Sequence, residues 1–329
     1  MRRLMPGFFF LVALVIMTVF LASCSKPSDP NTLQAVKGTP QSVDGSDAVW
    51  SKAPILAVKT GVITGTKALG PVEVKAQAVY SSSDVWFRLE WPDATESVDR
   101  SWSYDGTAWK KSGNEDRVGL YWEITSIKQF PSKGCAALCH NEGTEQSTWY
   151  MITPDEKARA DNWHWKAARS NPVGYADDKW LTGLLEDPKD LESANHGDKK
   201  QAGGDKDNRT EDKKGPAMMQ DPGKTPSAGV KFLLASEAVR LDQAKVKVSD
   251  KIPAYLLAKP DGSRGDIEAK GVYKDGKWVV VLHRSLNTGH DDDVQFNTAR
   301  TYPFGLAVFD NAGGVTHTVS QDPLMLKFK

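Results

Sequence analysis

Cysteine is scarce in this chain. Only three of the 329 residues are cysteines, at positions 24, 135 and 139. That number excludes a small scaffold held together by many disulfides, and it excludes a zinc or iron–sulfur centre ligated by four cysteines of one chain. Any chemistry of Cys135 and Cys139 therefore comes from that pair alone or from a cofactor that the pair holds.

A surplus of either charge is also absent. Lysine and arginine together number 42, and so do aspartate and glutamate. Nucleic acid is not expected as a partner, because phosphate binding needs a basic surplus or a basic stripe. The sequence also lacks a phosphate-binding Gly-Lys-Ser/Thr loop, a nucleophile elbow and a helix with paired zinc-binding histidines, which argues against an NTPase or a hydrolase.

The longest apolar run lies near the amino terminus and covers the 15 residues from Phe8 to Ala22. A bilayer-spanning helix needs ~20 residues, so this run is too short. It follows two arginines and ends in Leu-Ala-Ser-Cys24, which resembles a bacterial lipobox. We predict a lipoprotein signal peptide at residues 1–23, lipidation of Cys24 and a tether at residues 24–40. Ser25 in place of aspartate favours the outer membrane, on the periplasmic side of the cell envelope. An uncleaved anchor helix is the alternative.

Short strand patterns dominate residues 41–329. Alternating or β-rich segments occur at 72–76, 85–91, 119–124, 304–309 and 324–328. The runs 271–273 and 278–282 flank an Asp-Gly pair, which is typical of a β-hairpin. Helices are expected only near 154–157 and 235–244. We therefore predict a mainly β fold, an antiparallel β-sandwich with a few short helices.

One segment interrupts this pattern. Residues 189–227 are rich in lysine, aspartate, glycine and proline and hold almost no large aliphatic side chain. Such a segment buries too little apolar surface to offset the entropy lost on ordering. We predict a disordered internal loop there.

The residues from Cys135 to His140 carry the sharpest chemical signal. The standard c-type haem attachment is Cys, two residues, Cys, His. Here three residues separate Cys135 from Cys139, so the motif is a variant in which both thiols would bond to the haem and His140 would ligate the iron. Two other interpretations stay open. The cysteines form a disulfide beside a non-covalent haem, or they form a disulfide and there is no haem.

Segments in both halves of the chain resemble a known family. Trp163-His164-Trp165-Lys166 is the most specific of them, and the others are 167–169, 171–178, 264–267, 276–278, 290–296 and 302–305. Together they resemble the haem-binding domain of the ethylbenzene dehydrogenase γ subunit and related subunits of the dimethyl-sulfoxide-reductase superfamily. The resemblance implies one haem per chain, held in a β-sandwich by a methionine and a lysine. Met151 matches the family methionine and Lys270 the lysine, with Lys274 as the alternative.

The cysteine motif departs from that pattern. If the haem is covalent, His140 and Met151 are its expected ligands; otherwise they are Met151 and Lys270, and His140 has no role. In an extended segment Trp163 and Trp165 face one way and His164 the other. His164 therefore either lines the haem pocket or is an ordinary strand residue.

These patterns predict an electron carrier rather than an enzyme. A haem protein of this kind exchanges single electrons with a redox partner, here a cytochrome or a molybdenum oxidoreductase. The alternative is a haem-free lipoprotein that binds a carbohydrate or another small ligand. Residues 47–50 and 85–93 support it loosely, since they resemble the sandwich shared by sugar-binding modules and haem-binding domains.

Overall fold

The computed structural model describes residues 30–62, 70–141, 149–183, 195–196, 203–313 and 316–329, without the side chains of 139–150 and 195–196. The predicted signal peptide and Cys24 lie outside this part of the chain, as do residues 184–194 and 197–202, near or within the predicted loop. Residues 31–329 form one compact unit. None of the helices in the described residues is long and apolar enough to cross a membrane.

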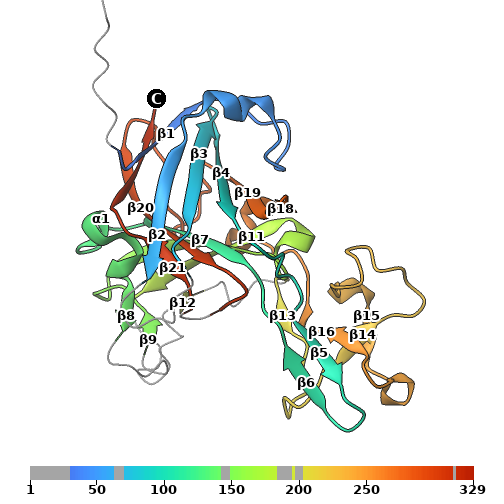
Figure 1. The fold of residues 1–329 in the computed structure, drawn as a ribbon. Coiled ribbons are helices and arrows are strands. Elements are labelled where there is room, and N and C mark those ends of the chain that lie inside the picture. Colours follow the sequence, from blue (N-terminus) through green and yellow to red (C-terminus); the bar gives the residue numbers. More distant parts are fainter. Residues whose placement is uncertain (1–29, 63–69, 142–148, 184–194, 197–202, 314–315) are drawn as a thin grey trace, which may run out of the picture. The chain divides into compact units, whose positions relative to one another are not determined.

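The fold is mainly β, as predicted, and is built on one sheet of 13 strands (Figure 1). Its strands are β1 (Thr32–Lys37), β2 (Leu56–Val62), β3 (Glu73–Tyr80), β4 (Asp84–Pro92), β7 (Arg117–Glu123), β10 (Arg159–Lys166), β11 (Tyr175–Thr182), β12 (Asn195–His196), β18 (Ile267–Lys274), β19 (Lys277–Ser285), β20 (Thr301–Phe309), β21 (Thr318–Ser320) and β22 (Leu324–Phe328). Ten of them close on themselves in the order β20-β21-β2-β3-β4-β19-β18-β11-β10-β7, because β7 pairs with β20. The sandwich is thus closed along both edges.

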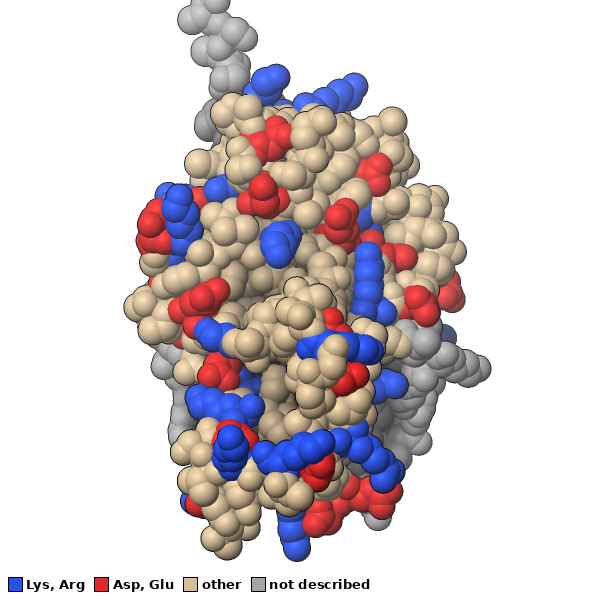
Figure 2. Space-filling view, turned by 90° about the vertical axis from the view of Figure 1, so that its right-hand side faces the viewer, with Lys and Arg blue, Asp and Glu red and all other residues tan. Residues whose placement is uncertain are grey.

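Four smaller sheets accompany this barrel. They are β5 (Ser101–Tyr104) with β6 (Trp109–Ser112) and β16 (Lys251–Pro253); β13 (Lys206–Asp207) with β17 (Tyr255–Leu256); β14 (Met218–Gln220) with β15 (Ala238–Arg240); and β8 (Cys139–Asn141) with β9 (Trp149–Met151). On the face that carries several of these strands, acidic and basic side chains are interspersed (Figure 2). This matches a chain with equal numbers of both.

Helices are short. Among the described residues they are α1 (Phe130–Lys133) and the 3-10 turns η1 (Ala48–Lys52), η2 (Gly134–Ala137), η4 (Asn171–Val173), η6 (Ala235–Glu237), η7 (Gln243–Lys245) and η8 (Ser263–Gly265). The single helix predicted at 235–244 is wrong, since β15 separates two 3-10 turns there, and 154–157 is a turn. The predicted hairpin is confirmed. Asp275 and Gly276 both have positive φ, 53° and 70°, between β18 and β19, as a two-residue type I′ turn requires.

Tryptophans fill the barrel interior. Trp91, Trp122, Trp163, Trp165 and Trp278 are all at most 1% exposed and belong to one core cluster. The rings of Trp165 and Trp278 lie 5.0 Å apart in a T-shaped pair, a favourable aromatic geometry. These side chains occupy the space between the sheets, where we expected a haem. The barrel interior that the structure describes is thus packed with aromatic side chains.

The predicted tether is too long. Residues 32–37 form β1, which pairs in parallel with β22 and β3. Leu33 and Ala35 alternate with more exposed residues and are buried in the core. This period-two pattern is typical of a half-buried strand, so the folded unit begins before residue 41.

The prediction of disorder is wrong for residues 203–227. Asp205 forms ion pairs with Arg169 and Arg264, at 3.2 Å each. The Asn208 side chain is 1% exposed, and its amide donates to the carbonyl oxygens of Met218 and Pro253. Buried polar contacts therefore order this segment, whereas the compositional argument counted only apolar burial.

Candidate cofactor site

One outer side of the barrel carries a second apolar cluster. Described residues between 127 and 158, among them α1 and η2, pack over the outward-facing side chains of β7, β10, β11 and β20. The cluster comprises Tyr121, Ile127, Phe130, Cys135, Leu138, Ala158, Ala160, Leu181, Ala307, Phe309, Ala312 and Val319. We call this outer surface of β7, β10, β11 and β20 the covered face. Residues 142–148 lie outside the described residues.

His164 lies on the covered face. Its neighbours Trp163 and Trp165 point into the barrel, so the predicted alternation is confirmed. Gly119 of β7 and Asp177 of β11 flank its backbone, and its ring stacks on Phe309 with centroids 5.5 Å apart. The Nε2 atom is buried and has no hydrogen-bond partner in the part of the chain that the structure describes. A buried, unsatisfied nitrogen is rare in folded proteins and requires an explanation.

His164 is held in its neutral form. Burial lowers the pKa of this imidazole well below its ordinary value, and the positive charges of Lys166, Arg117 and Arg169 lower it further. A neutral imidazole has one ring nitrogen with a free lone pair, which is the form that ligates metals. The covered face thus presents a nitrogen donor at neutral pH.

Met151 reaches the same cluster from β9. Its side chain is half-buried and packs against the cluster. The Tyr121 hydroxyl donates to the Met151 sulfur at 3.5 Å. The Tyr121 ring leans across Gly119, where an added Cβ would lie 3.6 Å from it, and Gly119 is paired with His164. Tyr121 therefore links the methionine to the position beside the histidine.

Cys135 lies under the same segment. It is 1% exposed and belongs to the apolar cluster of the covered face. Its sulfur packs onto the backbone of Gly305 in β20, where an added Cβ would meet it at 2.4 Å. The backbone of Cys139 is paired with Met151 and that of His140 with Tyr150. The predicted haem attachment, the alternative disulfide and the predicted iron ligand involve the side chains of Cys139 and His140, which lie outside the described residues.

Lys270 is in a different place. Its side chain is exposed on β18, and its backbone is paired with Val281 of β19. Strands β11 and β10 separate β18 from β7 in the sheet. Lys274 is also exposed, at the β18–β19 turn. The structure does not bring either lysine to the covered face with Met151.

Lys179 of β11 was not predicted from the sequence. Its backbone is paired with that of Asn162, which lies two residues before His164 and on the same face of β10. Among the described residues, the buried Oδ1 atom of Asn162 has no hydrogen-bond partner. Burial lowers the pKa of Lys179 to about 8, and the nearby Lys166 charge acts in the same direction. The sequence indicated only weakly that Lys179 is partly buried, because charged residues two positions apart, such as Asp177 and Lys179, are common on the exposed face of a strand.

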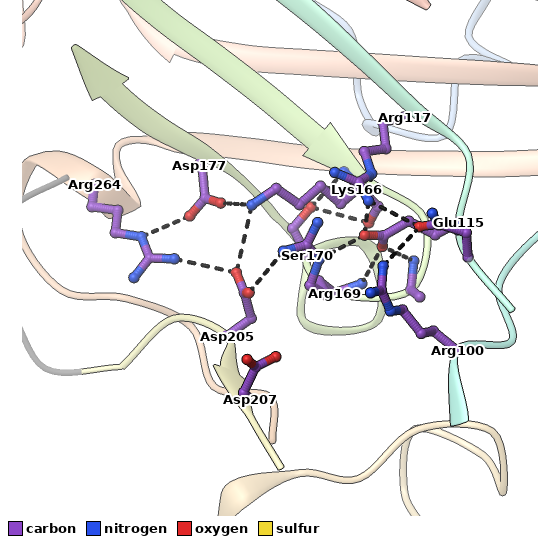
Figure 3. Close-up of polar contacts among 12 residues, drawn as sticks. Arg100, Glu115, Arg117, Lys166, Arg169, Ser170, Asp177, Asp205, Asp207 and Arg264 are labelled. Carbon is purple, nitrogen blue, oxygen red and sulfur yellow. Dashed lines mark hydrogen bonds and ion pairs between the residues drawn. The ribbon is translucent and has the colours of Figure 1, made fainter. Parts of the chain in front are cut away.

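A buried ion-pair network adjoins the site (Figure 3). Lys166 contacts Asp177 directly and lies 3.6 Å from Asp205. Arg264 lies 2.7 Å from Asp177. Burial alone would raise the pKa of Asp177, but Lys166, Lys179 and Arg264 outweigh it and hold the pKa far below its ordinary range.

The other half of the network centres on Glu115, which is fully buried. Its carboxylate lies 2.6 Å from Arg169 and 3.3 Å from Arg117. Carboxylates of the chain pair with both Lys166 and Arg169 (Figure 3). The network as a whole contains four cations and three carboxylates, which makes the surroundings of His164 positive.

The donor atoms on the covered face are of kinds that bind haem iron, whereas the barrel interior is filled by tryptophans. A nitrogen of a neutral imidazole and a thioether sulfur are both haem ligands. Both lie on the covered face, where Tyr121 donates to the Met151 sulfur and Gly119, two residues before Tyr121, pairs with His164. The unpartnered Nε2 atom of His164 is the feature that such a ligand would satisfy.

This chain is similar in sequence to one protein family and in structure to carbohydrate-binding proteins. A family model described as ethylbenzene dehydrogenase matches residues 47–320. No curated protein matches the chain in sequence. A carbohydrate-binding module of family 9 from Caldicellulosiruptor kristjanssonii, in complex with cellotriose, is similar in structure, with a TM-score of 0.37, 10% identity, and coverage of 91% of this chain and 93% of that one. A putative carbohydrate-binding protein from Bacteroides uniformis has a TM-score of 0.37 and 9% identity, covering 91% of this chain and 99% of that one.

Proposed function

Because the chain belongs to the ethylbenzene dehydrogenase family, we propose that it binds one haem on the covered face and passes single electrons to a partner protein. The unpartnered Nε2 atom of His164 carries this proposal. In the proposal His164 and Met151 hold the iron, and the chain has no catalytic activity of its own. Lys270 has no role, because it is exposed and lies on another strand.

The haem supplies the one-electron chemistry, and the residues around it supply orientation and electrostatics. Phe309 fixes the plane of the His164 ring by stacking on it. Tyr121 restrains the Met151 side chain through its hydroxyl. The buried network holds one more cation than carboxylates. This net positive charge would favour the reduced form of the haem iron and so raise its reduction potential.

The partner and the location are parts of the same proposal. A lipid at Cys24 would hold the protein on the periplasmic side of the envelope, at the outer membrane. The partner would be a cytochrome or a molybdenum oxidoreductase that docks through a small transient interface.

The visible spectrum of the purified full chain tests the proposal. We expect a sharp reduced band and a pyridine haemochrome equivalent to one haem per chain. Acid–acetone extraction then separates haem bonded to Cys135 and Cys139 from haem held by ligands alone. A colourless protein that takes up no added haemin would refute the proposal and favour the haem-free ligand-binding lipoprotein.

A further inference from the structure

Three carboxylates converge at one end of the barrel. Asp93 follows β4, Asp116 precedes β7 and Asp310 follows β20. One oxygen of each lies within 4.8 Å of the others. Two oxygens on opposite sides of a Ca²⁺ ion lie about 4.6–5.2 Å apart, since each Ca–O bond is about 2.3–2.6 Å. The group therefore has the dimensions of a calcium site.

This group lacks a counter-charge. Within the part of the chain that the structure describes, none of the three carboxylates forms an ion pair with a lysine, arginine or histidine. The two other carboxylate groups of this kind do have a cation. Arg284 lies 2.9 Å from Asp161 in one, and His290 lies 2.7 Å from Asp266 in the other. Burying like charges without compensation is costly.

The orientation of the carboxylates points to a missing ligand. Asp116 is fully buried and accepts hydrogen bonds from the backbone of Ser97 and Asn311 and from the Trp278 indole, which fix its position. Asp93 is 6% exposed, its Oδ1 atom accepts from the Thr95 backbone, and its Oδ2 atom is buried with no hydrogen-bond partner among the described residues. An unsatisfied carboxylate oxygen next to two other carboxylates is where a hard cation would bind.

Solvent can reach this group through Asp310, which is half-exposed. Calcium binds six to eight oxygens, so three carboxylates leave positions for water. We propose that Asp93, Asp116 and Asp310 bind a calcium ion that stabilises the end of the barrel where β4, β7 and β20 meet. The site is independent of the haem proposal, and its test needs no haem.

Terbium luminescence tests the site directly, because the Trp278 indole lies 2.9 Å from Asp116 and can sensitise a bound Tb³⁺ ion. In chelator-stripped full-length protein we expect emission on tryptophan excitation and its loss on adding Ca²⁺. We also expect Ca²⁺ to raise the unfolding temperature more than Mg²⁺ does, since Mg²⁺ needs a smaller octahedral site.

Substitutions assign the signal to these residues. Asp93→Asn and Asp310→Asn should each weaken Tb³⁺ and Ca²⁺ binding about ten-fold or more, because affinity depends on the number of charged ligands. Asp310 is half-exposed, so its variant should fold even if that at Asp93 does not. Asp266→Asn, in the group that contains His290, is the control and should bind as the unaltered chain does. The proposal is wrong if the unaltered protein shows neither sensitised emission nor a Ca²⁺-dependent shift, or if only Asp266→Asn weakens binding.

Discussion

At the scale of single residues, Asp93 links charge to stability. Burial raises its pKa to about 6 from 3.8, and the neighbouring Asp116 and Asp310 carboxylates raise it further in the same direction. The folded protein therefore binds this proton more tightly than the unfolded chain does. By linkage, the contribution to stability is complete below pH 4 and is lost as the pH rises towards 6.

Asp93→Asn should remove the loss of stability that accompanies ionisation of Asp93 as the pH rises. In the presence of chelator, we expect the variant to match the unaltered protein at pH 4 and to exceed its free energy of unfolding by about 1–3 kcal/mol at pH 8. Urea denaturation across this pH range measures the difference. A variant that is less stable at pH 8, or a difference that does not change with pH, would contradict this account. Asp293, whose pKa burial raises to about 7, is unchanged in both proteins and does not affect the comparison.

The sequence allowed some of these residue positions to be predicted. The alternation of Trp163 and Trp165 with His164 requires only that the segment be extended, and the structure has it so. The sequence could not show that Lys270 is exposed or that Lys179 lies on the covered face, since both depend on which strands become neighbours. Asp93, Asp116 and Asp310 are far apart in the chain, and only barrel closure brings them together.

At the scale of elements, buried ion pairs order the segment that begins at residue 203. Strand β13 pairs with β17, and the Trp102 indole donates to the Asn208 carbonyl oxygen at 2.7 Å. Asp205, with its side chain 10% exposed, joins this segment to the barrel through Arg169 and Arg264. Composition predicted disorder here because it records charge but not the pairing of charges.

Asp205→Asn should loosen this segment. Removing one partner from a buried ion-pair cluster costs about 3–5 kcal/mol, because the remaining charges stay buried. We expect a loss of that order in urea denaturation, together with new proteolytic cleavage within residues 203–227.

Asp207→Asn is the matched control, two residues away in the same segment. Its carboxylate is 35% exposed and lies 3.4 Å from Lys111, so the loss should be about 1 kcal/mol or less. Equal costs for the two variants would show that the buried network does not hold the segment.

At the scale of the whole molecule, barrel closure decides where a cofactor can lie. The sequence predicted the β-sandwich and several of its strands, but it could not show that β7 pairs with β20. Closure leaves an interior filled by tryptophans. The sequence patterns placed the haem there, whereas the Nε2 atom of His164, which has no partner among the described residues, is on the outer face, where the ring stacks on Phe309.

Near-infrared magnetic circular dichroism of the ferric protein, recorded with its low-temperature electron paramagnetic resonance spectrum, tests the central claim most directly. We predict the sulfur-to-iron charge-transfer band of a methionine ligand in the unaltered chain, its loss in Met151→Ala, and altered g values in His164→Ala. Lys270→Ala, which changes an exposed side chain, should leave both spectra unchanged. Spectra that change with Lys270 and not with His164 would contradict the assignment of the haem to the covered face.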